Sequence, residues 1–110
     1  MRIELLWFQD CPNHETAHRM IDEVLADLHV DAAVTRIEVP DETVGNRVCF
    51  PGSPTVRVDG EDVEPGWEPC EDCTPRCRVY LTPDGLRGLP PRAWLVDAIR
   101  RHVPPAAGAA

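Results

Sequence analysis

The sequence lacks long runs of apolar residues, and the run from Leu5 to Phe8 covers only four positions. A helix that crosses a membrane needs about 20 predominantly apolar residues in a row. The stretch from Met1 to Glu4 also lacks the apolar core of a secretory signal peptide. We therefore expect a cytoplasmic protein that has no membrane partner.

Basic charge is also scarce. The 110 residues include 19 acidic and 11 basic side chains, which gives a formal net charge of −8. Such a balance repels phosphate backbones and anionic membrane surfaces. We therefore expect no nucleic-acid partner.

The five cysteines are an odd number, so at least one thiol stays free or pairs with an external group. Stable structural disulfides are rare in the cytoplasm. The cysteines are therefore expected to be metal-binding, redox-active or simply buried.

The hydrophobic pattern predicts one α/β domain over residues 1–103 and a disordered tail over 104–110. Expected strands and helices follow in the order β-α-β-α-β-β-α. The strands are expected at residues 3–8, 33–39, 55–58 and 78–82, and the helices at 12–29, at 41–48 with Asp41 as N-cap, and from Pro90–Pro91 onward. Asp59-Gly60 is typical of a hairpin turn, and residues 61–76 are expected to form a loop.

Cys11 lies between the first expected strand and the first expected helix, with Pro12 at the first helical position. The unpaired N–H groups and the dipole of a helix N-terminus favour a thiolate at this place. A thiolate is both the nucleophile and the metal ligand of cysteine chemistry. The alternative is a partly buried thiol without a function.

Three stretches carry a resemblance to a known family: Asp10-Cys11-Pro12, residues 50–60 and residues 77–86. On these residues the chain resembles small bacterial thioredoxin-like and glutaredoxin-like proteins, and most of all the group known as alkylmercury lyase-like. The resemblance covers residues 2–102. It implies a thioredoxin-like fold, with a mixed four-stranded sheet flanked by helices and a cysteine-containing loop inserted in the last hairpin. It also implies a cis Ser53–Pro54 bond, with Pro54 beside the reactive Cys11.

His14 stands where a Cys-x-x-Cys motif would have its second thiol. No disulfide can close within this motif, so Cys11 is left with monothiol chemistry, a distant resolving cysteine or metal capture. A protonated His14 would lower the pKa of Cys11, and Asp10 would oppose that effect.

Cys70, Cys73 and Cys77 are spaced closely enough to bring three sulfurs into one loop. The spacing of the first two is typical of zinc knuckles, and a fourth ligand could come from Cys49, His14, Cys11 or water. Three thiolates also suit softer ions such as Cu(I) and, by extension, Hg(II). The alternatives are a Cys70–Cys73 disulfide or unreactive surface thiols.

Cys77 opens the last expected strand, and a regular sheet would place this end away from Cys11. The loop before it is long enough to fold back and lay Cys70 and Cys73 over Cys11. Cys49 is expected in the core, with a place near Cys11 as the alternative.

These features predict a thiol–disulfide oxidoreductase with Cys11, His14 and Pro54 in its active site and a protein or small-molecule thiol or disulfide as its partner. The alternative is a protein that binds zinc, copper or mercury through Cys70, Cys73, Cys77 and Cys49, with a possible role in mercury resistance. A third reading is an interaction module without chemistry of its own.

Overall fold

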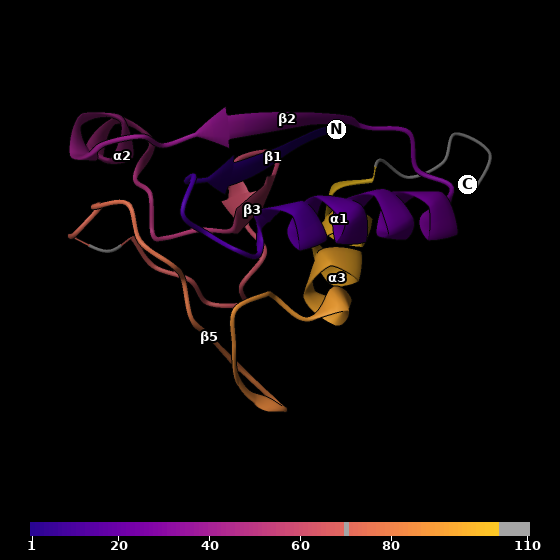
Figure 1. Cartoon of the computed structure of the whole chain (residues 1–110). Helices are drawn as coiled ribbons and strands as arrows, with labels where there is room; N and C mark the ends of the chain where they lie inside the picture. The colour runs from indigo at the N-terminus through magenta and orange to yellow at the C-terminus, as the bar shows by residue number, and fades with distance from the viewer. Residues whose placement is uncertain (70, 104–110) are drawn as a thin grey trace.

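The computed structural model describes residues 1–69 and 71–103, so the predicted tail, 104–110, and Cys70 lie outside the described part. In chain order the elements are β1 (Arg2–Trp7), α1 (His14–Leu28), β2 (Ala33–Glu38), α2 (Glu42–Val48), β3 (Thr55–Val58), β4 (Glu61–Asp62), β5 (Tyr80–Thr82), β6 (Gly85–Arg87) and α3 (Arg92–His102) (Figure 1).

The main sheet has four strands in the order β2-β1-β3-β4. β2 runs parallel to β1, β3 runs antiparallel to β1, and β4 runs antiparallel to β3. β1 takes the interior position, and its side chains Ile3, Leu5 and Leu6 are all fully buried. This burial explains the nearly continuous apolar pattern of the strand. The prediction of an α/β protein with a mixed four-stranded sheet is confirmed.

Apolar clusters cover both faces of this sheet, because successive side chains of a strand point to opposite faces. On one face, α1 and α3 pack against Ile3 and Leu5 of β1. On the other face, Leu6 packs with Val39 and Phe50, and α2 adds partly buried valines. Figure 1 shows α1 and α3 side by side, with α2 at the far end of the molecule.

The helices begin where local chemistry allows. The Asp41 carboxylate accepts a hydrogen bond from the Val44 N–H at 2.9 Å, which confirms Asp41 as the N-cap of α2. α1 begins at His14, so Pro12 lies before the helix and not in its first turn. No helix in the described part of the chain has both the length and the apolar character that a membrane span requires.

Residues 78–82 contain a strand, β5, but the prediction that this strand joins the main sheet is wrong. The position beside β3 is taken by β4, which follows at once after the Asp59-Gly60 turn. Both turn residues have positive φ, at 50° and 87°, as the tightest hairpin turns require. The short β4 thus occupies the edge position beside β3 that was expected for residues 78–82.

β5 and β6 instead form a separate antiparallel hairpin, in which Leu81 lies opposite Leu86. The resemblance implied that the cysteine-containing loop is inserted within the last hairpin of the main sheet. The structure shows that it is not. It connects the main sheet to this second hairpin, which projects from the body of the molecule (Figure 1).

Candidate active site

Cys11 lies in the turn between β1 and α1. Its backbone N–H donates to the Phe8 carbonyl at 3.1 Å, which closes the turn directly after the strand. The sequence predicted this place between strand and helix, and the structure confirms it.

The surroundings of the Cys11 thiol include a main-chain donor. The backbone N–H of Asn13, the N-cap residue of α1, donates to Cys11 Sγ at 3.4 Å. An N–H that points at a sulfur from the start of a helix stabilises negative charge on it. Cys11 is only 3% exposed, so neighbouring groups cover most of its surface.

The loop before β3 lies next to this turn. Leu6 of β1 pairs with Thr55 of β3, so the residues that follow β1 and precede β3 leave the same end of the sheet. The Ser53–Pro54 bond is cis, as the resemblance implied. The Tyr80 hydroxyl donates to the Pro54 carbonyl and ties this loop to the start of β5.

Cys77 is held alongside Ser53 by two backbone hydrogen bonds. The Ser53 N–H donates to the Arg76 carbonyl at 2.7 Å, and the Arg78 N–H donates to the Ser53 carbonyl at 2.8 Å. Together they form an isolated parallel bridge between Ser53 and Cys77.

Gly52 makes this close approach possible. Its φ is +130°, and a Cβ at this position would lie 2.8 Å from the Cβ of Arg78. A side chain would therefore both strain the backbone and push the Cys77 segment away.

The bridge brings Cys77 near Cys11, close enough for the Cys11 side chain to influence the pKa of Cys77. Partial desolvation raises the pKa of Cys77, and the charge of Cys11, the hydrogen bond with Cys11 and the charge of Asp10 raise it further. The expectation that Cys77 lies away from Cys11 is therefore wrong. It assumed that residues 78–82 continue the main sheet, whereas this segment turns back to pair with Ser53.

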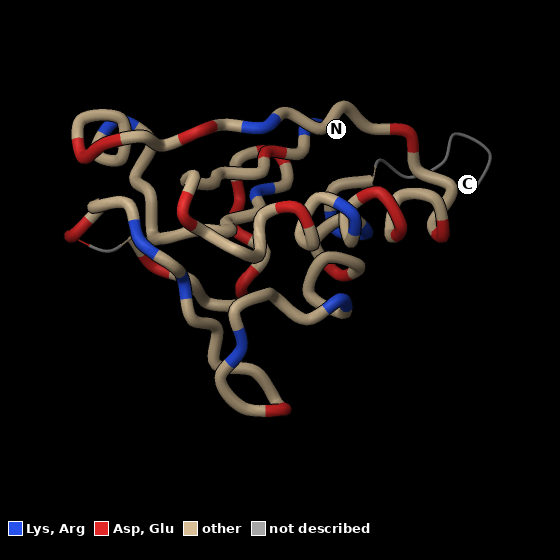
Figure 2. The backbone as a smooth tube through the Cα atoms, in the orientation of Figure 1, with Lys and Arg blue, Asp and Glu red and all other residues tan. Residues whose placement is uncertain are grey.

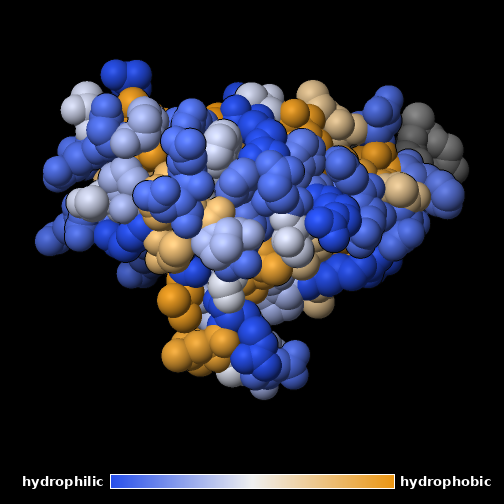
Figure 3. Space-filling view, in the orientation of Figure 1, coloured by the Kyte–Doolittle hydropathy of each residue, from blue (hydrophilic) through white to orange (hydrophobic). Residues whose placement is uncertain are grey.

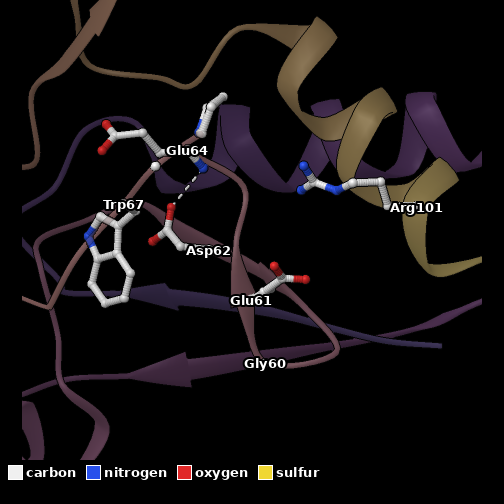
Figure 4. A pocket seen from close by; sticks show the side chains of 8 residues that line it. Gly60, Glu61, Asp62, Glu64, Trp67 and Arg101 are labelled. Carbon is white, nitrogen blue, oxygen red and sulfur yellow. Dashed lines mark hydrogen bonds between the residues drawn. The ribbon is translucent and has the colours of Figure 1, made fainter.

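A buried ion pair supports the segment behind Cys77. The guanidinium of Arg78 makes two hydrogen bonds to the Asp62 carboxylate, at 2.7 and 3.1 Å, and a third to the Thr55 hydroxyl at 3.0 Å. The same carboxylate accepts the Glu64 N–H at 2.9 Å, as Figure 4 shows beside Trp67. The ion pair thus joins β3, β4 and the Cys77 segment.

His14 faces another part of the surface. Its ring stacks on Trp7, with centroids 4.4 Å apart, and its Nδ1 lies 2.5 Å from a guanidinium nitrogen of Arg36. A guanidinium only donates, so Nδ1 accepts this hydrogen bond. Among the residues that the structure describes, His14 interacts with Trp7, Glu15 and Arg36, and it makes no hydrogen bond or ion pair with Cys11. The donor that reaches Cys11 is the Asn13 backbone N–H, a main-chain donor at the helix start as the sequence analysis expected.

The other cysteines occupy different places. Cys49 caps the C-terminus of α2 with a positive φ of 53° and is exposed, so the expectation of a core position is wrong. Cys73 is buried, and its carbonyl packs closely against Gly45 of α2. Within residues 1–69 and 71–103, no three His, Cys, Asp or Glu side chains form a group that could hold a metal ion. The predicted site included Cys70, which lies outside this part, so it stays a prediction.

Sequence reasoning missed Cys77 as a neighbour of Cys11, and it missed the Arg78–Asp62 pair. The pattern of this segment offered no signal for the ion pair, because the aliphatic residues Val79 and Leu81 alternate with Arg78 and Thr82 and favour the opposite side as the buried one. No family model, curated protein or solved structure was found to match this chain.

Proposed function

We propose that this protein is a thiol–disulfide oxidoreductase in which Cys11 is the attacking thiolate and Cys77 is the resolving thiol. The observation that carries the proposal is the position of Cys77, which the backbone bridge to Ser53 holds near Cys11. It supplies the second sulfur that the Cys-Pro-Asn-His motif lacks. Both thiols are free in the structure, as the reduced form requires.

The reaction proceeds in two exchanges. The Cys11 thiolate attacks one sulfur of the substrate disulfide, a mixed disulfide forms, and the other substrate sulfur leaves as a thiolate. That thiolate takes the proton of Cys77, whose sulfur then attacks the sulfur of Cys11. The second substrate sulfur leaves as a thiolate and takes a proton from water. The protein dithiol is oxidised to a Cys11–Cys77 disulfide, and the substrate disulfide is reduced to two thiols.

The charges favour this order of attack. The Asn13 N–H donates to the Cys11 sulfur and would stabilise a thiolate there, whereas desolvation and the neighbouring Cys11 raise the pKa of Cys77 and favour its protonated thiol. A protonated thiol does not attack, so Cys77 acts only after the mixed disulfide has removed the charge from Cys11.

We infer further that the fold is thioredoxin-like. Support comes from the order β1-α1-β2-α2-β3-β4-α3, from the cysteine in the β1–α1 turn and from the cis-proline loop beside it. On this reading, the β5–β6 hairpin is an insertion between β4 and α3 that brings the resolving thiol to the site.

The test of this function is reduction of a protein disulfide, such as that of insulin, by the pre-reduced protein. We expect the wild type to reduce it, Cys11→Ser to be inactive, and Cys77→Ser to stop at a stable mixed disulfide that mass spectrometry finds on Cys11. Cys49→Ser is the matched control, because Cys49 is exposed at the end of α2, and it should keep full activity. A wild type without activity, or a Cys11→Ser variant with full activity, would contradict the proposal.

The proximity of Cys11 and Cys77 also favours soft-metal binding as a second candidate function. Two adjacent thiolates suit soft ions such as Cu(I) and Hg(II). Native mass spectrometry of the reduced protein with added zinc, copper or mercury tests this candidate. Metal binding that is lost in Cys11→Ser/Cys77→Ser but kept in Cys70→Ser/Cys73→Ser would support binding by this pair. The reverse pattern would support the predicted Cys70–Cys73 site.

A further inference from the structure

The segment from Cys77 to Thr82 has two distinct sides. Arg78, Tyr80 and Thr82 are buried, whereas the residues that alternate with them, Cys77, Val79 and Leu81, are exposed. Alternate side chains of an extended chain lie on one side. The resolving thiol and two apolar side chains therefore form a single outward row.

This row continues onto β6, because Leu86 is paired directly with Leu81. Val79 is 63% exposed, Leu81 74% and Leu86 65%. Figure 3 shows apolar side chains gathered on the projecting hairpin. We call the surface formed by Cys77, Val79, Leu81 and Leu86 the hairpin face. Clustered large apolar side chains on a protein surface are typical of interaction sites.

A hollow of about 380 Å³ adjoins the hairpin face at Cys77. Its lining includes Pro51, Trp67 and Val79, together with the charged Glu64 and Arg76. A side chain of a bound partner has room here directly beside the resolving thiol. The hairpin face is thus continuous with the candidate active site.

Charges of both signs flank the hairpin face. Arg76 precedes Cys77 and pairs with the Asp72 carboxylate at 3.2 Å. Figure 2 shows basic residues along both strands that leave the body and an acidic residue at the tip, which is Asp84 in the turn. Arg87 is exposed and donates to the adjacent Leu86 carbonyl, and it forms no ion pair with the residues that the structure describes. Arg87 therefore fits a partner that carries an acidic side chain near Leu86.

We propose that the hairpin face is the docking surface for an extended, apolar polypeptide segment that carries the substrate disulfide and has an acidic residue near it. The inference rests on the proposed function, since it names the substrate as a protein and not a small disulfide. Extended residues advance about 3.4 Å each, so Val79 and Leu81 lie about 7 and 14 Å along the row from Cys77. A partner segment with apolar residues two and four positions from its cysteine matches this spacing.

The test compares two disulfides with the pre-reduced full chain. One is a peptide disulfide with leucines two and four positions from a cysteine and a glutamate beyond them, and the other is hydroxyethyl disulfide. We expect Leu81→Ser/Leu86→Ser to lower the rate constant for the peptide about tenfold, because each apolar truncation costs a fraction of the docking free energy. The rate constant for hydroxyethyl disulfide should change less than about twofold. Equal losses for both disulfides, or no loss for the peptide, would overturn the proposal.

Val103→Ser is the matched control, because Val103 is an exposed apolar residue at the end of α3, away from the hairpin (Figure 1). It should change neither rate. A second variant, Arg87→Glu, tests the charge. We expect it to slow the peptide that carries glutamate and to favour a peptide with lysine in the same place. An unchanged preference would contradict the acidic partner.

Binding without chemistry separates docking from the proposed function. A fluorescent peptide with serines in place of its cysteines should bind the wild type and bind Leu81→Ser/Leu86→Ser about tenfold more weakly. If this difference appears while the wild type reduces no disulfide, the docking surface stands and the proposed function falls. A concentration-dependent dimer in sedimentation that the double variant abolishes would instead assign the hairpin face to a second copy of this chain and overturn the proposal.

Discussion

The two central sulfurs differ in exposure. Cys11 is buried against the start of α1, whereas Cys77 is exposed on the hairpin face. In the proposed reaction, the exposed Cys77 lies near the mixed disulfide as soon as it forms on Cys11. This geometry shortens the life of the intermediate, because intramolecular exchange competes well with external thiols.

The coupling between the two thiols can be measured at Cys77. Because the Cys11 charge contributes to the raised pKa of Cys77, we expect Cys11→Ser to lower that pKa while desolvation still acts on it. Cys77 should then react faster with iodoacetamide at mildly alkaline pH than it does in the wild type. Peptide mass spectrometry of initial rates across pH measures this, with Cys49 as internal reference. An unchanged pH profile of Cys77 would mean that the two sulfurs do not interact.

Tyr80 is the one tyrosine of the chain, and its hydroxyl donates to the Pro54 carbonyl. Its ionisation therefore tests whether this hydrogen bond is buried. Burial raises the pKa of Tyr80 well above its ordinary value of 10.0, and the nearby carboxylates of Asp62 and Glu64 add to the rise, against the opposing effect of Arg78. The folded protein therefore binds the phenol proton more tightly than the unfolded chain. This group leaves stability unchanged below the ordinary pKa and lowers it as pH rises above that value.

We expect tyrosinate absorbance to appear only together with loss of helical circular dichroism in an alkaline titration. Tyrosinate that forms near pH 10 with the helices intact would contradict the burial of Tyr80 and its hydrogen bond to Pro54.

At the scale of elements, the sequence pattern correctly predicted the features that depend only on neighbouring residues. The apolar run of β1, the amphipathic α1, the Asp41 N-cap and the Asp59-Gly60 turn each depend on a few neighbouring residues. The position of Cys11 between strand and helix follows from the first two. The cis bond at Pro54 was implied by the resemblance, since the dipeptide alone does not determine it.

The position of Cys77 depends on a competition between distant segments. Residues 78–82 have an alternating pattern that fits a fourth strand, but the two residues of β4 occupy the edge of β3. The later segment then pairs with Ser53 and forms a hairpin with β6. Periodicity predicts which side chains of a strand share a face, but it does not predict which strand lies beside it. The position of Cys77 could therefore not be predicted from the sequence.

The ion pair between Arg78 and Asp62 is expected to hold this arrangement together. Asp62→Asn would leave the Arg78 guanidinium buried without a carboxylate, and we expect it to lower the free energy of unfolding by about 3–5 kcal/mol. Glu64→Gln is the matched control, because Glu64 lies 3.7 Å from Arg78 and is more exposed, and it should cost no more than about 1 kcal/mol. Urea denaturation measures the free energy of unfolding of both variants. Equal losses would show that the buried ion pair contributes no more to stability than the more exposed Glu64.

At the scale of the whole molecule, the site joins parts that are far apart in the chain. The β1–α1 turn near the N-terminus meets a segment that lies beyond the main sheet, and backbone pairing with Ser53 connects the two. A Cys11–Cys77 disulfide would therefore close a long loop. We expect the oxidised protein to be more stable than the reduced one, by up to about 4 kcal/mol for a loop of this length. Denaturation of both forms measures this, and a less stable oxidised form would indicate a strained or different disulfide.

Disulfide mapping after mild oxidation tests the central claim most directly. All 11 basic residues are arginines, so trypsin separates Cys11, in residues 3–19, from Cys77, which remains with Arg78 alone. Cys49 falls in residues 48–57, and Cys70 and Cys73 share residues 58–76. We expect the main product to link residues 3–19 to residues 77–78. A Cys70–Cys73 disulfide with Cys11 and Cys77 both free would contradict the proposed pair.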